Sequence, residues 1–302
     1  QPQPFFRPTG GENLQRHSFT LSQNDVLALS GPCVVEVELR QESAFTSAET
    51  AARLADPAVG HWTFPAEGGE RPFSTVKAEG NRVILTWEGE EGFAPLEDGN
   101  YAVRFTGNSG HGRTALDGVR LRSRPMGTLP LDSVSFGDVP LDLEEGGYCF
   151  GRRPADYGLC YFRSDRVFRK RGARALLRLD IVPVVNDLSD QTPHYQFNQR
   201  IIDKRDAVAI VPDDVYIAQV AWEYFNGTGW RTLKVSGSRN PFSCKQDVSL
   251  EVTFDVPGDL EETEVNAQSG YYIRARVVHV ENAYSTTPRW LVPLLKGAVC
   301  SW

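Results

Sequence analysis

Several features that mark common protein classes are missing from this sequence. No apolar stretch approaches the roughly 18 residues that a membrane-spanning helix needs, and no charged-then-apolar leader stands at the start. The formal net charge is -7, so the concentrated Lys and Arg that bind nucleic-acid phosphates are lacking. We therefore expect no membrane span and no signal peptide, and a main partner other than nucleic acid.

Cysteine is also scarce. The five cysteines are odd in number and unevenly spaced, at Cys33, Cys149, Cys160, Cys244 and Cys300. A disulfide-rich secreted domain would carry a denser set, so we expect mostly buried thiols in a reducing compartment. Pairing of Cys149 with Cys160 across a loop stays open, because spacing in sequence does not fix the distance between two thiols.

The composition that remains is that of a globular protein rich in strands. Hydrophobic residues make up 40% and charged residues 24% of the chain, which argues against wholesale disorder. Aromatic residues reach 11%, with 27 Gly and 19 Pro. Aromatic side chains fill pleated surfaces and Gly and Pro favour turns, so many short strands are indicated. A length of 302 residues suggests two domains.

The first half shows strand patterns around one helix. Apolar and polar residues alternate, at least in part, at 17–21, 34–39, 82–88 and 100–106. Such alternation is typical of half-buried strands. Residues 46–56 predict the one short helix, because Thr46 or Ser47 can cap it and Glu49 stands where a capping box places an acid.

A Pro- and Gly-rich stretch at 122–140 separates the halves, and we place the boundary near residue 128, giving domains 1–127 and 128–302. Beyond it, strand patterns resume at 174–185, 217–225, 230–235, 248–256 and 272–280. The NGTG sequence at 226–229 predicts a hairpin, because Asn and Gly tolerate positive φ. The predicted fold class is all-β, with two antiparallel β-sandwich-like domains and one short helix in the N-terminal half.

The second half also carries aromatic motifs in a characteristic order. They are WEYFNG at 222–227 followed by Trp230, FDVP at 254–257 and GYYIRAR at 270–276, preceded by FG at 136–137 and an aromatic, basic segment at 161–173. Over roughly residues 134–280 this order resembles a module of large baseplate proteins from contractile phage tails and related injection machines. The chain departs from the usual pattern at Tyr272, where Trp is usual, and at Arg169, where Ser is usual.

The resemblance implies a structural protein without a catalytic residue, cofactor or metal. Its partners would be other tail or baseplate proteins. Its location would be the bacterial cytoplasm during assembly and a phage or phage-like particle afterwards. The alternation within the motifs also indicates a core, since Trp222 and Tyr224 share one face of their strand. We expect the core to include Trp222, Tyr224, Trp230, Phe254 and Ile273.

Residues 152–178 form the one strongly basic stretch of this acidic protein. A basic patch of this kind can dock an acidic surface and steer assembly. The side chains that we predict to bind a partner are Arg163, Arg166, Arg169, Lys170 and Arg171. The alternative is a set of separate solvated residues on alternating strand faces.

Trp62 and Trp87, with Phe64 and Phe73 near them in sequence, are candidates for a platform on which a sugar ring stacks. Tryptophan suits a core as well as a surface, so both interpretations stay open. A glycan is accordingly a second candidate partner. The corresponding alternative function is that of a carbohydrate- or surface-binding module of the adhesin type.

The sequence offers no catalytic constellation. The loop GNSGHG at 107–112 lacks the G-x-S-x-G spacing of a nucleophile turn. The five histidines are scattered singly, and the acidic segments 142–145 and 259–262 lie beside Gly or Pro, as solvated turns do. We therefore predict no catalytic residue, no cofactor and no metal. A hydrolase whose site the sequence does not reveal is a further alternative.

Overall fold

The computed structural model describes residues 17–40, 47–108, 118–187, 213–236, 240, 242–243, 248–285 and 288–302. Strands take up 56% of these residues and helices 6%, so the predicted all-β fold class is confirmed. The chain forms two compact units, Gln1–Thr128 and Leu129–Trp302. The Pro- and Gly-rich stretch at 122–140 spans the division between them.

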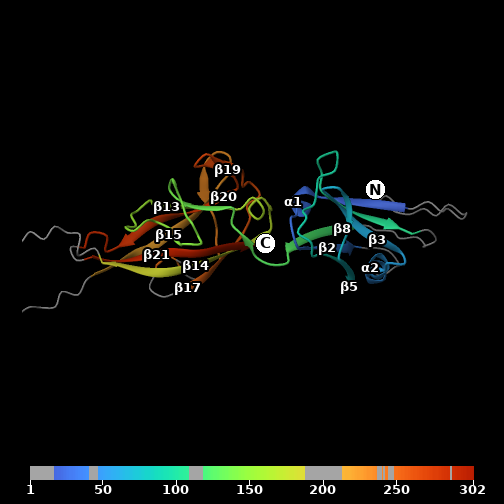
Figure 1. Ribbon diagram of the computed structural model, residues 1–302, viewed down its shortest axis with the longest axis horizontal. Coiled ribbons are helices and arrows are strands. Elements are labelled where there is room, and N and C mark those ends of the chain that lie inside the picture. The colour runs from blue at the N-terminus through green and yellow to red at the C-terminus, as the bar shows by residue number, and fades with distance from the viewer. Residues whose placement is uncertain are drawn as a thin grey trace, which may run out of the picture. The chain divides into compact units, whose positions relative to one another are not determined.

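In the part of the first unit that the structure describes, the strands form two antiparallel four-stranded sheets (Figure 1). One sheet has the order β1 (His17–Ser22), β7 (Ala102–Gly107), β3 (Gly60–Ala66) and β4 (Gly69–Pro72). The other has the order β5 (Thr75–Glu79), β6 (Arg82–Trp87), β2 (Cys33–Arg40) and β8 (Gly118–Pro125). All four strand segments predicted in this half correspond to strands: β1, β2, β6 and β7.

Alternation decides which side chains fill this sandwich. In β2, Val35 and Val37 are buried, whereas Glu36 between them lies on the opposite face and is within 3.4 Å of an arginine of β6. The two sheets meet where Phe64 of β3 packs edge-on against Trp87 of β6, with ring centroids 5.0 Å apart. Burial of one face of each strand is what a period of two residues predicts.

The described residues of the first unit include two helices. Helix α2 (Ser47–Ala55) is the predicted helix, and it buries Ala51 and Leu54 along one face. Helix α1 (Asn24–Leu27) is not predicted by the sequence. It is a single turn, and four residues are too few to show a helical period in the pattern of apolar residues.

The second unit is, among the described residues, an eleven-stranded sheet whose two layers share one core, together with a small separate hairpin. The first layer contains β10 (Ser133–Phe136), β11 (Val139–Pro140), β13 (Leu159–Arg163), β15 (Asp213–Phe225), β16 (Trp230–Thr232) and β20 (Tyr272–Glu281). The second layer contains β9 (Leu129–Pro130), β12 (Gly147–Tyr148), β14 (Arg174–Asp187), β17 (Val248–Asp255) and β21 (Pro288–Ser301). The hairpin consists of β18 (Thr263–Val265) and β19 (Gln268–Gly270).

The two layers are joined through β15. Its first residues, Asp213–Val215, pair in parallel with Pro288–Trp290 of β21, and from Tyr216 onward it pairs antiparallel with β20. This short parallel pair departs from the purely antiparallel sheets that the sequence predicts. The parallel pairing follows from the directions of the strands. Because β20 and β21 are consecutive strands that run in opposite directions, a strand antiparallel to β20 runs parallel to β21.

The predicted hairpin connects β15 to β16, with Phe225 opposite Trp230, and is confirmed. Asn226 Oδ1 accepts a hydrogen bond from the Gly229 N–H at 3.1 Å, and Gly227 has a φ of 85°. The turn therefore uses the two properties that single out Asn and Gly, a side chain that bonds nearby backbone and freedom to adopt positive φ.

The cysteines that the structure describes are buried thiols rather than disulfides: Cys33, Cys149, Cys160 and Cys300. Cys149 and Cys160 are not bonded to each other. Cys244 lies outside the described residues.

Candidate functional site

A buried carboxylate organises the outer face of the first layer. Glu223 of β15 is only 7% exposed, although it lies on the face of the strand opposite the core residue Trp222. Arg274 and Arg276 of β20 share its face, as their spacing of two residues requires. Arg274 Nε donates to Glu223 Oε2 at 2.8 Å, and Arg276 Nε donates to Glu223 Oε1 at 2.9 Å.

This arrangement keeps Glu223 ionised. Burial raises the pKa of its carboxyl, but the hydrogen bonds from Arg276 and Arg274 outweigh burial, so the pKa lies below its usual value. A carboxyl that has to donate a proton in catalysis needs the opposite shift. The Glu223 network is therefore suited to holding β15 and β20 together.

Aromatic rings extend this network over the outer face. The Arg274 guanidinium lies 4.0 Å from the centroid of Trp230, and Trp230 meets Phe225 and Tyr161 at centroid distances of 5.8 and 5.7 Å. We call Tyr161, Phe225, Trp230 and Arg274 the arginine–aromatic cluster. The prediction that Trp230 belongs to the core is wrong, because it lies half-buried in this cluster. It pairs directly with Phe225, and directly opposed residues share a face.

The other residues predicted for the core lie in or beside it. Trp222, Phe254 and Ile273 are buried in the core of the second unit. Tyr224 is half-buried against that core, and its hydroxyl donates to Asp259 Oδ1 at 3.0 Å.

The five basic residues predicted to bind a partner do not form one surface. Arg166, Arg169 and Arg171 are exposed in the turn between β13 and β14. Arg163 is half-buried and already paired with Asp165, with Nε 3.3 Å from Oδ1. Lys170 is only 3% exposed.

The prediction that Lys170 contacts a partner is therefore wrong. The turn is tight: the Lys170 N–H donates to the Val167 carbonyl at 3.0 Å, and the Ala173 N–H donates to the Lys170 carbonyl at 2.9 Å. This fold brings the lysine side chain inward, where its ammonium group lies 5.3 Å from the ring centroid of Trp302. Its neighbours Arg169 and Arg171 are exposed instead, and Arg171 Nη2 donates to the Leu260 carbonyl at 3.4 Å.

The proposed sugar platform is also contradicted. Trp62 is 1% exposed, and its indole Nε1 donates to the Leu54 carbonyl of α2 at 2.9 Å. Its ring packs against Phe19 and Phe105, with centroids 5.5 and 5.3 Å away. A sugar cannot stack on a ring that protein atoms cover on both sides.

Trp87 is half-buried and separate from that group. It packs on Phe64, and its Nε1 donates to the Glu91 carbonyl at 3.0 Å. Phe64 and Phe73, which lie near the two tryptophans in sequence, are both buried. The rings proposed for a platform therefore take part in packing the first unit.

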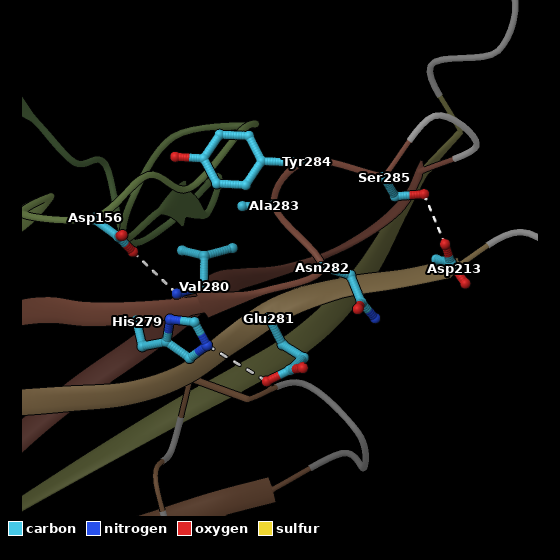
Figure 2. A pocket seen from close by; sticks show the side chains of 9 residues that line it. All are labelled: Asp156, Asp213, His279, Val280, Glu281, Asn282, Ala283, Tyr284 and Ser285. Carbon is cyan, nitrogen blue, oxygen red and sulfur yellow. Dashed lines mark hydrogen bonds and ion pairs between the residues drawn. The ribbon is translucent and has the colours of Figure 1, made fainter.

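The second unit also has a polar hollow of about 340 Å³ that the sequence does not predict (Figure 2). Its lining residues are Asp156, Asp213, Val280, Ala283 and Ser285, together with His279, Glu281, Asn282 and Tyr284. They come mainly from the end of β20 and the turn after it. The turn reverses at Asn282, which has a positive φ of 54°.

The polar side chains around this hollow make separate contacts, two with each other and one with backbone. His279 Nε2 lies 3.5 Å from Glu281 Oε2, as residues two apart on a strand can, and the Ser285 hydroxyl donates to Asp213 Oδ2 at 2.8 Å. Asp156 Oδ1 accepts from the Val280 N–H at 3.0 Å. In a nucleophile relay the histidine would instead contact the serine. The bonds of Asp156 and Asp213 fasten the end of β20 and its turn to neighbouring segments.

Some of the residues considered for catalysis lie outside the described residues. Residues 109–112 of the GNSGHG loop, His111 among them, are outside the described residues, and so is His194. Within the described ranges, no three side chains of His, Cys, Asp or Glu are grouped to hold a metal ion. In the same ranges, neither α1 nor α2 has the length and apolar character for crossing a bilayer.

No model of a known protein family matches the chain, and no curated protein matches it.

Proposed function

We propose that the chain is a non-catalytic structural module of a contractile, phage-type tail baseplate that works through protein contacts. The order of aromatic motifs over residues 134–280 supports the tail assignment. One structural observation carries the contact role: an exposed basic turn in an acidic chain. We call Arg166, Arg169 and Arg171 the basic turn.

The basic turn is suited to an acidic partner surface. Among the described residues, no carboxylate lies within ion-pair distance of these three arginines, whereas Arg163 beside them is paired with Asp165. The backbone is held by hydrogen bonds such as that from the Gly172 N–H to the Val256 carbonyl at 2.8 Å. A rigid turn that presents arginines to solvent loses little entropy on binding, and arginine is enriched at protein interfaces.

The basic turn is opposite in charge to the chain as a whole. The whole chain carries a net charge of -7, so general electrostatics would repel an acidic partner. A local basic site then favours one orientation of approach, and its effect weakens as salt screens it. This predicts an interface whose strength depends on these three side chains more than on net charge.

The test combines gene context with binding. Sheath, tube and spike genes beside the gene for this chain would agree with the proposal. The products of the adjoining genes are then coexpressed with the chain, and complexes are isolated by size-exclusion chromatography. A triple variant, Arg166→Ser with Arg169→Ser and Arg171→Ser, should keep the parent melting temperature and weaken the complex, most of all at low salt.

The first unit supplies a matched control. Replacing Arg120, Arg122 and Arg124 of β8 by Ser removes the same charge from side chains that are 49%, 52% and 58% exposed but are paired with Glu38 and Glu36 of β2. The control should bind like the parent. If both triple variants weaken the complex equally, the weakening comes from the change in net charge and not from the basic turn. If the chain forms no complex with any tail-type product, the proposal is refuted. Binding of the parent to a glycan array, with no protein complex, would favour the adhesin alternative instead.

A further inference from the structure

The arginine–aromatic cluster brings together the residue types that contribute most to protein interfaces. Strand register sets Arg274 of β20 directly between Tyr161 of β13 and Glu223 of β15. The guanidinium carbon of Arg274 lies 4.0 Å from the ring centroid of Trp230, and the aromatic rings of the cluster are half-buried. Trp, Tyr and Arg dominate the hot spots of protein interfaces. The cluster therefore has the composition of a docking site.

The face that carries the cluster also keeps a positive charge. Arg276 shares this face with Arg274, and among the described residues Glu223 is the only carboxylate within ion-pair distance of either arginine. Across the sheet, Arg276 stands between Leu159 and Ala221, whose side chains offer no acceptor. One carboxylate cannot accept from all the N–H groups of two guanidiniums. One positive charge on this face is therefore not compensated.

We propose that the arginine–aromatic cluster and Arg276 form a docking face for a protein segment that presents an Asp or Glu carboxylate next to an apolar or aromatic side chain. The inference rests on the contact role in the proposed function and adds the chemistry of the partner. The carboxylate pairs with Arg276, whose side chain is 30% exposed, and the apolar side chain packs on Trp230. Glu261, which lies against Gly227 at the tip of the hairpin, repels the carboxylate from that end, so one orientation is favoured.

The basic turn lies next to this docking face. Arg171 Nη2 donates to the Leu260 carbonyl at 3.4 Å, and the following residue, Glu261, donates its N–H to the Phe225 carbonyl at 2.9 Å. The basic turn and the aromatic hairpin therefore meet the same segment of chain. An acidic partner that the basic turn attracts is thus held near the rings, which supply the apolar contact that solvated arginines lack.

A library of short random peptides tests the docking face without any tail protein. The folded chain is immobilised and challenged with displayed peptides, and the selected peptides are synthesised. Each is paired with a copy in which every Asp or Glu is replaced by Asn or Gln. We expect the selected sequences to combine an acid with a neighbouring apolar or aromatic residue. The amide copies should bind about tenfold more weakly, because one charge pair is lost.

Variants locate the binding. Trp230→Ala should weaken binding of the selected peptides by about 30-fold, as loss of a hot-spot aromatic does. Arg276→Gln should bind acidic peptides and amide copies equally. The matched control is Arg178→Gln, which also removes an arginine paired with a glutamate, Glu251, but from the second layer. It should keep the parent's affinity and its preference for the acid. Arg276→Gln carries the test even where Trp230→Ala fails to fold.

The outcomes separate the docking face from the proposed function. If no acidic peptide is selected, or if Trp230→Ala and Arg276→Gln bind like the parent, the docking face is overturned and the basic turn alone carries the contact role. A parent dimer that Trp230→Ala dissociates in size-exclusion chromatography assigns the face to a second copy of the chain and also overturns the inference. If the peptide results are as expected but no tail-type product binds, the docking face stands and the tail assignment fails.

Discussion

Truncating Trp222 to Ala should destabilise the second unit much more than truncating Trp230. Trp222 is 5% exposed, and its ring centroid lies 5.7 Å from that of Phe162 and 6.1 Å from that of Phe242. Removing its indole leaves a cavity between the two layers that neighbouring rings can fill only in part. Truncation of a core tryptophan typically costs about 3–5 kcal/mol.

Truncating Trp230 to Ala should lower the free energy of unfolding by less, because its ring lies on the outer face. Truncation removes the contact with Arg274, worth about 0.5–2 kcal/mol, and weakens the packing against Phe225 and Tyr161. Water can then enter the vacated space, so no closed cavity remains. We therefore expect a loss of about 1–2 kcal/mol. Against a typical stability of about 5–15 kcal/mol, the two losses are well separated.

Urea unfolding followed by far-ultraviolet circular dichroism measures both losses, because the backbone signal of the strands remains when an indole is removed. Phe162→Leu, a milder change in the same core, serves as a reference for the size of the loss in stability. The Trp222→Ala transition should move to much lower urea, and the Trp230→Ala transition by less than half as much. Equal shifts, or a Trp222→Ala protein that unfolds with the parent, would refute the assignment of the two tryptophans to opposite faces.

Two further expectations follow from single side chains. The lowered pKa of Glu223 means that its ionised form stabilises the fold above the unfolded pKa of about 4.3, and that this contribution is lost as the pH falls through the lower folded pKa. The melting-temperature deficit of Glu223→Gln should therefore be largest at neutral pH and shrink on acidification; a deficit independent of pH would contradict the ion network. Trp62→Ala should cost the first unit about 3–5 kcal/mol in a thermal melt, since the ring is in its core. A variant that melts normally but loses binding to a glycan would restore the sugar platform.

Local alternation predicts much of the second unit. Ile273 and Ala275 are buried while Arg274 and Arg276 lie on the other face, as a period of two residues requires. The pattern does not predict which acid these arginines meet. That acid is Glu223, which stands directly opposite Arg274 only because β15 and β20 pair in one particular register. Register between strands about fifty residues apart depends on the whole core, which local sequence does not describe.

Lys170 and Trp62 show why the sequence pattern predicted the wrong exposure for two side chains. A run of basic residues indicates a solvated surface on average, but a tight turn sends consecutive side chains in different directions, and Lys170 points inward. For Trp62 the sequence does carry a signal. Trp62 and Phe64 are two residues apart on one strand and so share a face, and two large aromatic rings on one face indicate burial more strongly than exposure.

The side of the sheet on which Trp230 lies can also be derived from the sequence, once the predicted hairpin fixes which residues pair across it. Alternation that begins with a buried Trp222 puts Phe225 on the outer face, three positions on. A turn that occupies 226–229 makes Phe225 and Trp230 direct cross-strand partners, and such partners lie on the same side of a sheet. Trp230 therefore has to face outward with Phe225, so it can stabilise the hairpin without entering the core. The same reasoning makes its ring, beside Arg274, the part of the aromatic motif that a neighbouring protein could reach.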